Sequence, residues 1–155
     1  EKEARDALDG EFDVAGDDAG PNIGQLTQDA EAGAAEAQFQ LGKCHDEGIR
    51  VPQNSAEAIA WYRKAAEQGF SDGQYMLGNA YAYGIEVEQD YNEALAWYGK
   101  AAEQGHVEAQ YNLGMSYHYG IGVEEDEERA GQWYAKAAEQ GHEPSQTGLG
   151  RLGDL

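Results

Sequence analysis

The stretch over residues 73–108, GQYMLGNAYAYGIEVEQDYNEALAWYGKAAEQGHVE, decides the fold because the chain repeats it on both sides without a gap. Residues 37–72 are identical to it at 18 of 36 positions, and residues 109–144 at 21 of 36. A partial copy follows over residues 145–155, and residues 25–36 resemble the second half of an earlier copy. Because a fixed period of this size is typical of stacked repeat proteins, the register predicts a solenoid.

Each copy has the pattern of two helices joined by a loop. In the middle copy, Leu77 and Ala80 lie on one face of a predicted helix over about residues 72–83. Gly84 ends this helix, because a residue without Cβ adopts the left-handed conformation at low cost. Asp90 is a good N-cap for the second helix, and Glu93 three positions later predicts a capping box. The equivalent N-caps in the other copies are Asn54 and Asp126, Glu57 repeats the capping box, and the second helices end at Gly69, Gly105 and Gly141.

Small and aromatic residues recur at fixed positions and predict how the helices pack. The recurring glycines, which would let the two helices of a unit approach closely, are Gly42, Gly78 and Gly114. The recurring tryptophans, each followed by a tyrosine, are Trp61, Trp97 and Trp133. We interpret these aromatic residues as core packing between neighbouring units rather than as a cofactor site. One unit cannot bury its apolar face alone, so stacking must supply the stability.

The pattern A-x-x-x-L-G-x-x-Y-x-x-G-x-G-V, followed by A-x-x-W-Y-x-K-A-A-x-Q-G, resembles the Sel-one-like repeat, a relative of the tetratricopeptide repeat. The resemblance runs from Ala37 to about Gly150. It implies an all-α fold: an α/α superhelix of about three full 36-residue two-helix repeats plus partial capping units, with the first helix of each unit on the concave side. It also implies an adaptor role in protein complexes, commonly in bacteria. Arg50 and Glu86 depart from the family's loop glycine, and Gly131 weakens the last second helix.

Residues 1–24 belong to no repeat and predict an acidic, flexible leader ahead of a repeat solenoid over residues 25–155. Acidic residues outnumber basic ones by 30 to 10 in the whole chain, which gives a formal net charge of −20. Such a surface repels phosphate backbones and anionic lipids, so we expect neither nucleic-acid binding nor a membrane-surface role. No apolar run reaches the roughly 18 residues of a membrane-spanning helix, so we expect no membrane insertion either.

The compartment stays open at this point. The chain begins at Glu1 rather than Met, which is compatible with a trimmed N-terminus from which a signal peptide has been lost. We therefore favour an exported or periplasmic bacterial protein slightly over a cytoplasmic one.

Histidines in this chain have a structural interpretation. His45 takes the repeat position of Tyr81, while His106 and His142 follow the Gln-Gly turn in the way that Phe70 does. They are therefore predicted to pack within and between units. Since no pair of ligands has metal-binding spacing, the sequence predicts no metal site.

The sequence also predicts no catalytic residues. Cys44 shares its repeat position with Ala80 and Ser116, which are small, so we expect a buried structural thiol. It is the only cysteine, so no intrachain disulfide can form and the cysteine-rich branch of the family is excluded. Nucleophile motifs and phosphate-binding glycine loops are absent. We therefore expect no cofactor and no enzymatic activity.

Helical spacing places a stripe of residues on the first helices, opposite their packed side. By analogy with tetratricopeptide grooves, this stripe faces a ligand. The candidate partner-binding residues are Tyr75, Asn79, Tyr83, Tyr111, Met115, His118 and Tyr119. The stripe also includes Ala82 in the middle copy and Phe39, Lys43, Asp46 and Glu47 in the first copy. Tyrosine and methionine suit an interface because they supply contact area without a full charge to desolvate. Packing against the adjacent unit is an equal alternative for Tyr75 and Tyr111.

The sequence thus favours a protein- or peptide-binding adaptor or scaffold that uses its concave face. Acidic residues in the loops would favour a ligand with basic flanks. The alternative is a structural piece that assembles or oligomerises through its terminal repeat, where Leu149 and Leu152 lie on a helix without a partner helix of its own. The oligomeric state, the identity of the partner and the extent of a longer repeat array stay open.

Overall fold

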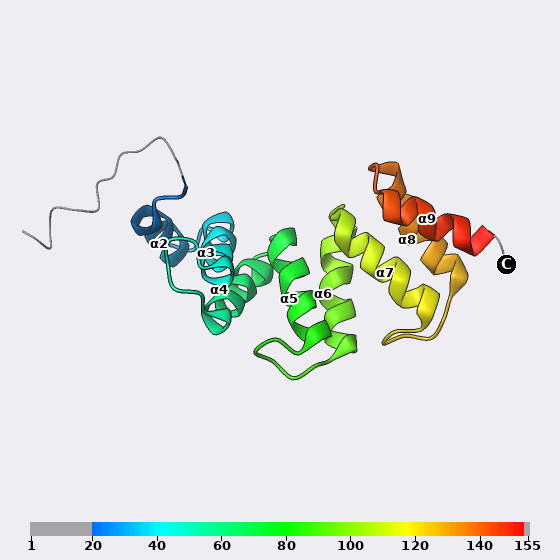
Figure 1. Ribbon diagram of the computed structural model, residues 1–155, viewed down its shortest axis with the longest axis horizontal. Helices are drawn as coiled ribbons and strands as arrows, with labels where there is room; N and C mark the ends of the chain where they lie inside the picture. Colours follow the sequence, from blue (N-terminus) through cyan, green and yellow to red (C-terminus); the bar gives the residue numbers. More distant parts are fainter. Residues whose placement is uncertain (1–19, 154–155) are drawn as a thin grey trace, which may run out of the picture.

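The computed structural model of the protein describes residues 20–153, which fold into eight helices and contain no strand. Most of the predicted leader therefore lies outside the described residues. The helices are α2 (Ile23–Glu31), α3 (Ala35–Glu47), α4 (Ser55–Glu67), α5 (Ser71–Tyr83), α6 (Tyr91–Glu103), α7 (Val107–Tyr119), α8 (Glu127–Glu139) and α9 (Glu143–Gly153). They follow one another along an elongated row, with α2 and α9 at opposite ends (Figure 1). This arrangement confirms the predicted all-α solenoid.

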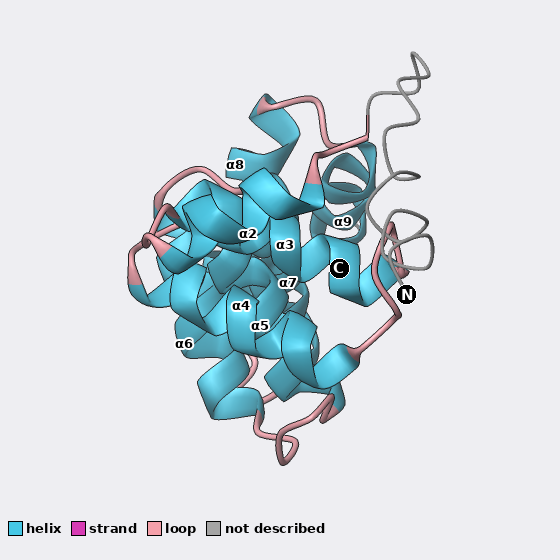
Figure 2. Ribbon diagram, turned by 90° about the vertical axis from the view of Figure 1, so that its left-hand side faces the viewer, coloured by secondary structure: helices cyan, strands magenta, loops and turns pink. Residues whose placement is uncertain are grey.

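Each helix packs against its neighbours in sequence. The pairs α3–α4, α5–α6 and α7–α8 form the three repeats, and the first helices of these pairs begin 36 residues apart. In addition, α7 contacts α9 directly, whereas no pair of second helices in the described part of the chain has a comparable contact. At this end, successive first helices therefore lie closer to each other than successive second helices do, as expected for helices on the inner side of a superhelix. A view along the row shows the helices stacked behind one another (Figure 2).

Glycines end the first helices as predicted. Gly48, Gly84 and Gly120 have left-handed φ values of 69°, 66° and 63°, and the next amide returns to a carbonyl of the last turn. The N-caps of the second helices are also as predicted. The side chains of Asn54, Asp90 and Asp126 accept bonds from backbone N–H groups of the first turn at 2.9–3.1 Å.

The predicted capping box is only half formed. A full box would direct the side chains of Glu57 and Glu93 to the N-cap backbone N–H groups. Those N–H groups instead donate to carbonyls of the preceding helix: Asn54 to His45 at 2.8 Å and Asp90 to Tyr81 at 2.9 Å. The loop therefore folds back onto the end of the first helix, and a backbone carbonyl fills the role that the glutamate would have had.

The closest packing inside each unit joins a glycine of the first helix to a tyrosine of the second. A Cβ atom on Gly42, Gly78 or Gly114 would lie 2.5–2.7 Å from the ring of Tyr62, Tyr98 or Tyr134, respectively. These three tyrosines are buried, with at most 4% of their surface exposed. The predicted close approach of the two helices is confirmed, and it depends on the absence of a side chain at the glycine.

The tryptophans are less buried than the tyrosines that follow them in the sequence, although the repeat pattern predicted both as core residues. Trp61 and Trp133 pack at the edge of clusters that include the preceding unit, as predicted. However, all three tryptophans keep part of their surface exposed, and a lysine one turn later lies over each ring, for example Lys100 Nζ at 4.3 Å from the centre of the Trp97 ring. The largest stabilising contacts of the second helices therefore come from the tyrosines.

Buried glutamines join successive units. Gln74 donates from Nε2 to the carbonyl of Ala66 in the preceding unit, and its Oε1 accepts from Gln104 in its own unit. The same two bonds recur through Gln38 and Gln110. Because Gln38 bonds to Ala30 of α2, this helix takes the place of the second helix of an earlier repeat, as predicted for residues 25–36. The helix begins at Ile23, so the boundary at residue 25 lies inside it.

Two loop residues have a conformation that normally belongs to glycine. Arg50 and Glu86 have φ values of 59° and 56°, and Gly122 has 74° at the same repeat position. The left-handed conformation costs a non-glycine residue roughly 1–2 kcal/mol. At Gly122 a side chain would also meet Tyr91, since an added Cβ would lie 2.7 Å from the Cβ of that tyrosine. The loop of the third repeat therefore requires glycine more strictly than the loops before it.

Candidate protein-binding face

Tyr83 and Tyr119 end the first helices and are the most exposed of the candidate side chains. Their exposed fractions are 73% and 49%. His118 stacks on Tyr119 with ring centres 4.3 Å apart, which orders that ring without burying it. Two large aromatic rings at one repeat position thus stand outside the core, where solvent or a partner can contact them.

Tyr75 and Tyr111 pack between units, as the alternative interpretation held. Tyr75 stacks on His106, the N-cap residue of α7 in the next helix pair, at 4.6 Å between ring centres. Tyr111 lies 4.9 Å from His142, which directly precedes α9. Both rings are partly buried, and each also contacts the buried tyrosine of its own unit. Their rings therefore form part of the stack, and only their outer edges are available to a ligand.

The hydroxyl groups of two buried tyrosines contact residues of the candidate face from the core side. Tyr98 donates to Oδ1 of Asn79 at 2.5 Å, and the hydroxyl of Tyr134 lies 3.2 Å from Nδ1 of His118. Burial raises the pKa of Tyr134 to about 12 and raises the pKa of Tyr98 further still. These hydroxyls therefore stay protonated at neutral pH and hold Asn79 and His118 in place.

The structure corrects one member of the predicted stripe. Ala82 is 8% exposed and belongs to the core, so its place on the stripe was wrong.

Two of the histidines, His106 and His142, have carboxylate partners that the sequence reasoning missed. Nε2 of His106 lies 2.9 Å from Asp72, and Nε2 of His142 lies 3.2 Å from Glu108. The signal was present, because Asp72 and Glu108 precede their histidines by the same interval of 34 residues. Residues 20–153 contain no group of three His, Cys, Asp or Glu residues that could hold a metal ion. Cys44 is buried, and burial raises the pKa of its thiol above the ordinary value.

A cavity of about 270 Å³ lies between α7 and α9 and brings three of the candidate residues together. Tyr111, Met115 and Tyr119 line it from α7. The remaining lining residues are Tyr134, Pro144, Thr147, Gly148 and Arg151. Sequence reasoning missed Arg151, although the register could have found it, because Arg151 lies 36 residues after Met115.

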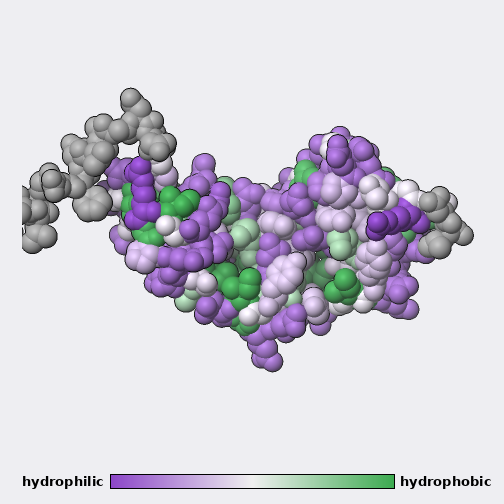
Figure 3. All heavy atoms as spheres, viewed as in Figure 1, coloured by the Kyte–Doolittle hydropathy of each residue, from purple (hydrophilic) through white to green (hydrophobic). Residues whose placement is uncertain are grey.

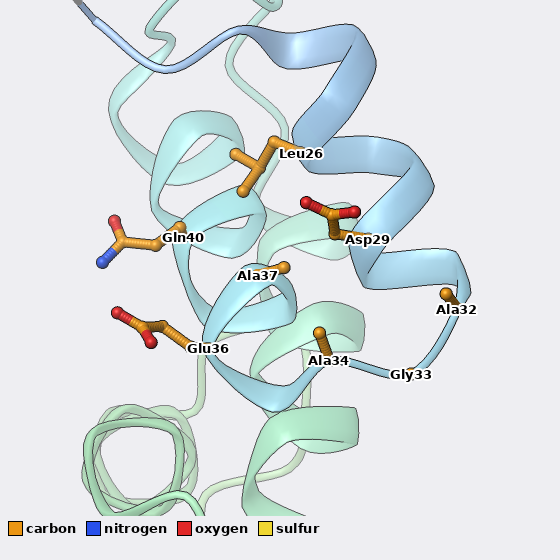
Figure 4. Close-up of a pocket in the computed structure, with 8 residues that line it drawn as sticks. All are labelled: Leu26, Asp29, Ala32, Gly33, Ala34, Glu36, Ala37 and Gln40. Carbon is orange, nitrogen blue, oxygen red and sulfur yellow. The ribbon is translucent and has the colours of Figure 1, made fainter.

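A second cavity, of about 690 Å³, lies between α2 and α3 and was not predicted. Leu26 and Asp29 extend into it from α2, and Glu36, Ala37 and Gln40 line it from α3 (Figure 4). Leu26 takes the repeat position of Tyr62, and its counterparts in the complete repeats pack against a first helix of their own unit. Among the described residues no first helix precedes α2 to cover Leu26 in this way.

Hydrophilic side chains dominate the long side of the molecule shown in Figure 3, and apolar residues gather there only in small, separate patches. In the described part of the chain, no helix is long and apolar enough to cross a membrane. The apolar surface on this side is therefore divided among separate side chains and is not a single broad patch.

The fold and the repeated contacts define a helical-repeat protein of the solenoid class. The Sel1 repeat matches residues 35–70, 71–106 and 107–142 in succession. The chain belongs to the Sel1 repeat family, which confirms the resemblance. Proteins of this family generally serve as scaffolds for protein interactions and are generally non-catalytic, which supports a protein partner.

Solved structures agree with this assignment. The chain is 43% identical, with a TM-score of 0.78, to a protective antigen of uropathogenic Escherichia coli strains that displays an SLR fold; the match covers 82% of this chain but only 27% of the antigen. It is 41% identical to a Sel1 repeat protein from Oxalobacter formigenes, with a TM-score of 0.77 and coverage of 86% and 98%. Cysteine-rich protein B of Helicobacter pylori is 24% identical and shares the fold, with a TM-score of 0.63. No curated protein matches the chain.

Proposed function

We propose that the protein is a non-enzymatic adaptor that binds an extended segment of another protein along its concave face. The observation that carries this proposal is the exposure of Tyr83 and Tyr119 at one repeat position, 36 residues apart, at 73% and 49%. Exposed aromatic rings are unfavourable in water but are enriched at the centres of interfaces. Neighbouring rings on successive units would support the apolar side chains of an extended ligand.

Polar groups on the same face would orient the ligand backbone. Oδ1 of Asn79 is occupied by Tyr98, whereas its amide nitrogen has no bond among residues 20–153. This nitrogen can donate to a carbonyl of an extended peptide. The acidic loop residues at the rim, Glu86, Glu88, Glu124 and Glu125, are all exposed and would attract basic residues that flank the bound segment.

The test is a double variant, Tyr83→Ala with Tyr119→Ala, titrated with a peptide selected from a random linear library against the wild-type protein. We expect affinity to fall by about 2 kcal/mol, the usual size of a hot-spot loss, while the melting temperature changes little. The matched control is Tyr91→Ala, which removes a tyrosine that is 43% exposed and lies at the start of a second helix, outside the proposed face. Equal losses in the control and the double variant would contradict the proposal.

The second candidate function is assembly through the terminal unit. Leu149 and Leu152 on α9 are partly buried, and Leu152 packs toward α8, so less apolar surface is left there than the sequence suggested. Light scattering at rising protein concentration separates the two functions. A monomer at all concentrations would count against assembly, and a dimer that α9 variants disrupt would favour it.

A further inference from the structure

Most basic side chains in this acidic protein are held by an aromatic ring or an oxygen atom of the chain. Of the ten basic residues, Lys2 and Arg5 lie outside the described residues, which leaves eight. Six of the eight have such a contact: Lys64, Lys100 and Lys136 over tryptophans, Arg63 and Arg129 over tyrosines, and Arg50 at the carbonyl of Pro21. The other two, Lys43 and Arg151, have no hydrogen bond, ion pair or ring contact among residues 20–153.

These two cations occupy the same repeat position. Residues 43, 79, 115 and 151 are separated by 36 residues each and are Lys43, Asn79, Met115 and Arg151. We call this set the concave row. Met115 and Arg151 line the same cavity, so this position faces the inner side at the α7–α9 end. In a chain with a net charge of −20, the two uncommitted cations thus stand at the two ends of the proposed binding face.

The cavity beside Arg151 is built for part of a ligand. Its volume of about 270 Å³ lies just below the range of about 300–1,000 Å³ for sites that enclose a whole small molecule, so it fits a side chain or two of a longer ligand. Tyr111, Met115 and Pro144 supply apolar wall, and Arg151 supplies hydrogen-bond donors, whereas the hydroxyl of Thr147 already donates to the carbonyl of Glu143. Arg151 and Tyr134 line the same cavity; burial raises the pKa of Tyr134, and the positive charge of Arg151 opposes that rise.

We propose that the protein segment bound on the concave face carries an Asp or Glu side chain that pairs with Arg151, next to an apolar residue that enters the cavity, and a second acidic residue that pairs with Lys43. This inference rests on the proposed function and specifies the chemistry of its partner. A guanidinium binds a carboxylate through two parallel hydrogen bonds, which gives direction as well as attraction. Lys43 contributes less, because Asp46 and Glu47 lie close to it in the same helix turn.

A ligand segment with only two acidic residues is compatible with the strongly acidic surface of this protein. The whole molecule repels a strongly acidic partner at long range, so a polyacidic segment is excluded. A segment with one carboxylate at each end of the groove and basic residues beyond the rim matches both the cations of the concave row and the exposed acids of the loops.

The test uses linear peptides selected from a random library on the full chain, each synthesised again with its Asp or Glu changed to Asn or Gln. The key variant is Arg151→Met, because Met115 shows that methionine is accommodated at this repeat position. The control is Arg129→Met, which changes the net charge equally and removes an arginine that pairs with Asp126. Arg151→Lys tests whether the forked geometry is needed.

We expect Arg151→Met to weaken binding of the acidic peptide about tenfold or more, with no further loss for the Asn or Gln peptide, as for two groups that act as a pair. Lys43→Met should have a smaller effect, and Arg129→Met none. Selected peptides without acidic residues, or equal affinities of wild type and Arg151→Met, would overturn the inference. If the Tyr83 and Tyr119 double variant still lost affinity in that case, the concave face would stand as the binding site; if neither variant had an effect, both proposals would fail.

Discussion

Tyrosines in two regions of this molecule have opposite surroundings although they belong to the same repeat. Tyr98, on a second helix, is 4% exposed and packs against the backbone of Gly78. Tyr83, at the end of a first helix, is 73% exposed. The interior tyrosine is present in all three repeats, whereas the repeat position of Tyr83 holds glutamate in the first copy, at Glu47. The contact that joins the two helices of a unit thus recurs in every copy, whereas the outward-facing position varies.

The polar partners of the interior tyrosines show the boundary between these regions. The hydroxyl groups of Tyr62, Tyr98 and Tyr134 lie 2.5–3.2 Å from Asp46, Asn79 and His118 in turn. The tyrosine stays the same while its partner on the first helix changes in every unit. Variation among the repeats therefore begins on the first helices, on the face that we propose for ligand binding.

The sharpest test of the comparison replaces one tyrosine from each region. Tyr98→Ala should lower the free energy of unfolding by about 3–5 kcal/mol, the usual cost of truncating a buried aromatic side chain to a cavity. Tyr83→Ala should change it by less than about 1 kcal/mol, because its ring contacts mainly solvent. Chemical denaturation measures both. Similar losses for the two variants would show that the exposed ring supports the fold and would remove it from the binding face.

A pair of glycines tests the close contact itself. Gly78→Ala should cost about 1–3 kcal/mol, because the new Cβ would lie 2.6 Å from the ring of Tyr98 and overpacking forces the helices apart. Gly99→Ala is the matched control: it lies inside α6 with nothing within 4 Å of the new Cβ, so it should stabilise the protein by up to about 1 kcal/mol. Thermal or urea unfolding of the two variants should therefore move in opposite directions. A gain for both would mean that the helices of a unit separate easily.

The smallest expected effect is a pH dependence from the interior tyrosines. Burial raises the pKa of Tyr134 to about 12, above the value near 10 of an unfolded tyrosine. The neutral hydroxyl is thus favoured in the folded state; its contribution to stability is complete below pH 10 and is lost as the pH rises from 10 to 12. Tyr134→Phe should make the fall in stability over this range less steep. An identical slope in wild type and variant, measured by urea unfolding at each pH, would contradict the assignment.

Much of the fold was predictable because the repeat tests each interpretation three times. The recurrence of Gly84 and Asp90 equivalents at fixed intervals predicted the helix ends, and Cys44 was recognised as buried from the small size of Ala80 and Ser116. Which of Trp97 and Tyr98 is the more deeply buried was predicted less well. Both residues recur in every unit, so recurrence alone cannot show that the tyrosine meets a glycine backbone while the tryptophan lies under a lysine.

The candidate site was predictable only in part. The exposure of Tyr83 and Tyr119 followed from their helical position, and their part in binding stays a prediction. The choice between groove and stack for Tyr75 depended on His106, which caps the first helix of the next pair. Arg151 was missed because the partial copy was treated as a cap. The carboxylate partners of His106 and His142 were missed because each lies 34 residues earlier, on the preceding first helix.

The sequence by itself determined the repeat length, the two-helix unit, the helix ends and the family, because these depend on residues that are close in the chain and recur at a constant interval. The tertiary structure decided which aromatic residues are interior, which cations have no partner among residues 20–153 and where a cavity forms between α7 and α9. These properties depend on contacts between units, and the angle at which one unit meets the next is set by packing over the whole interface rather than by any single residue.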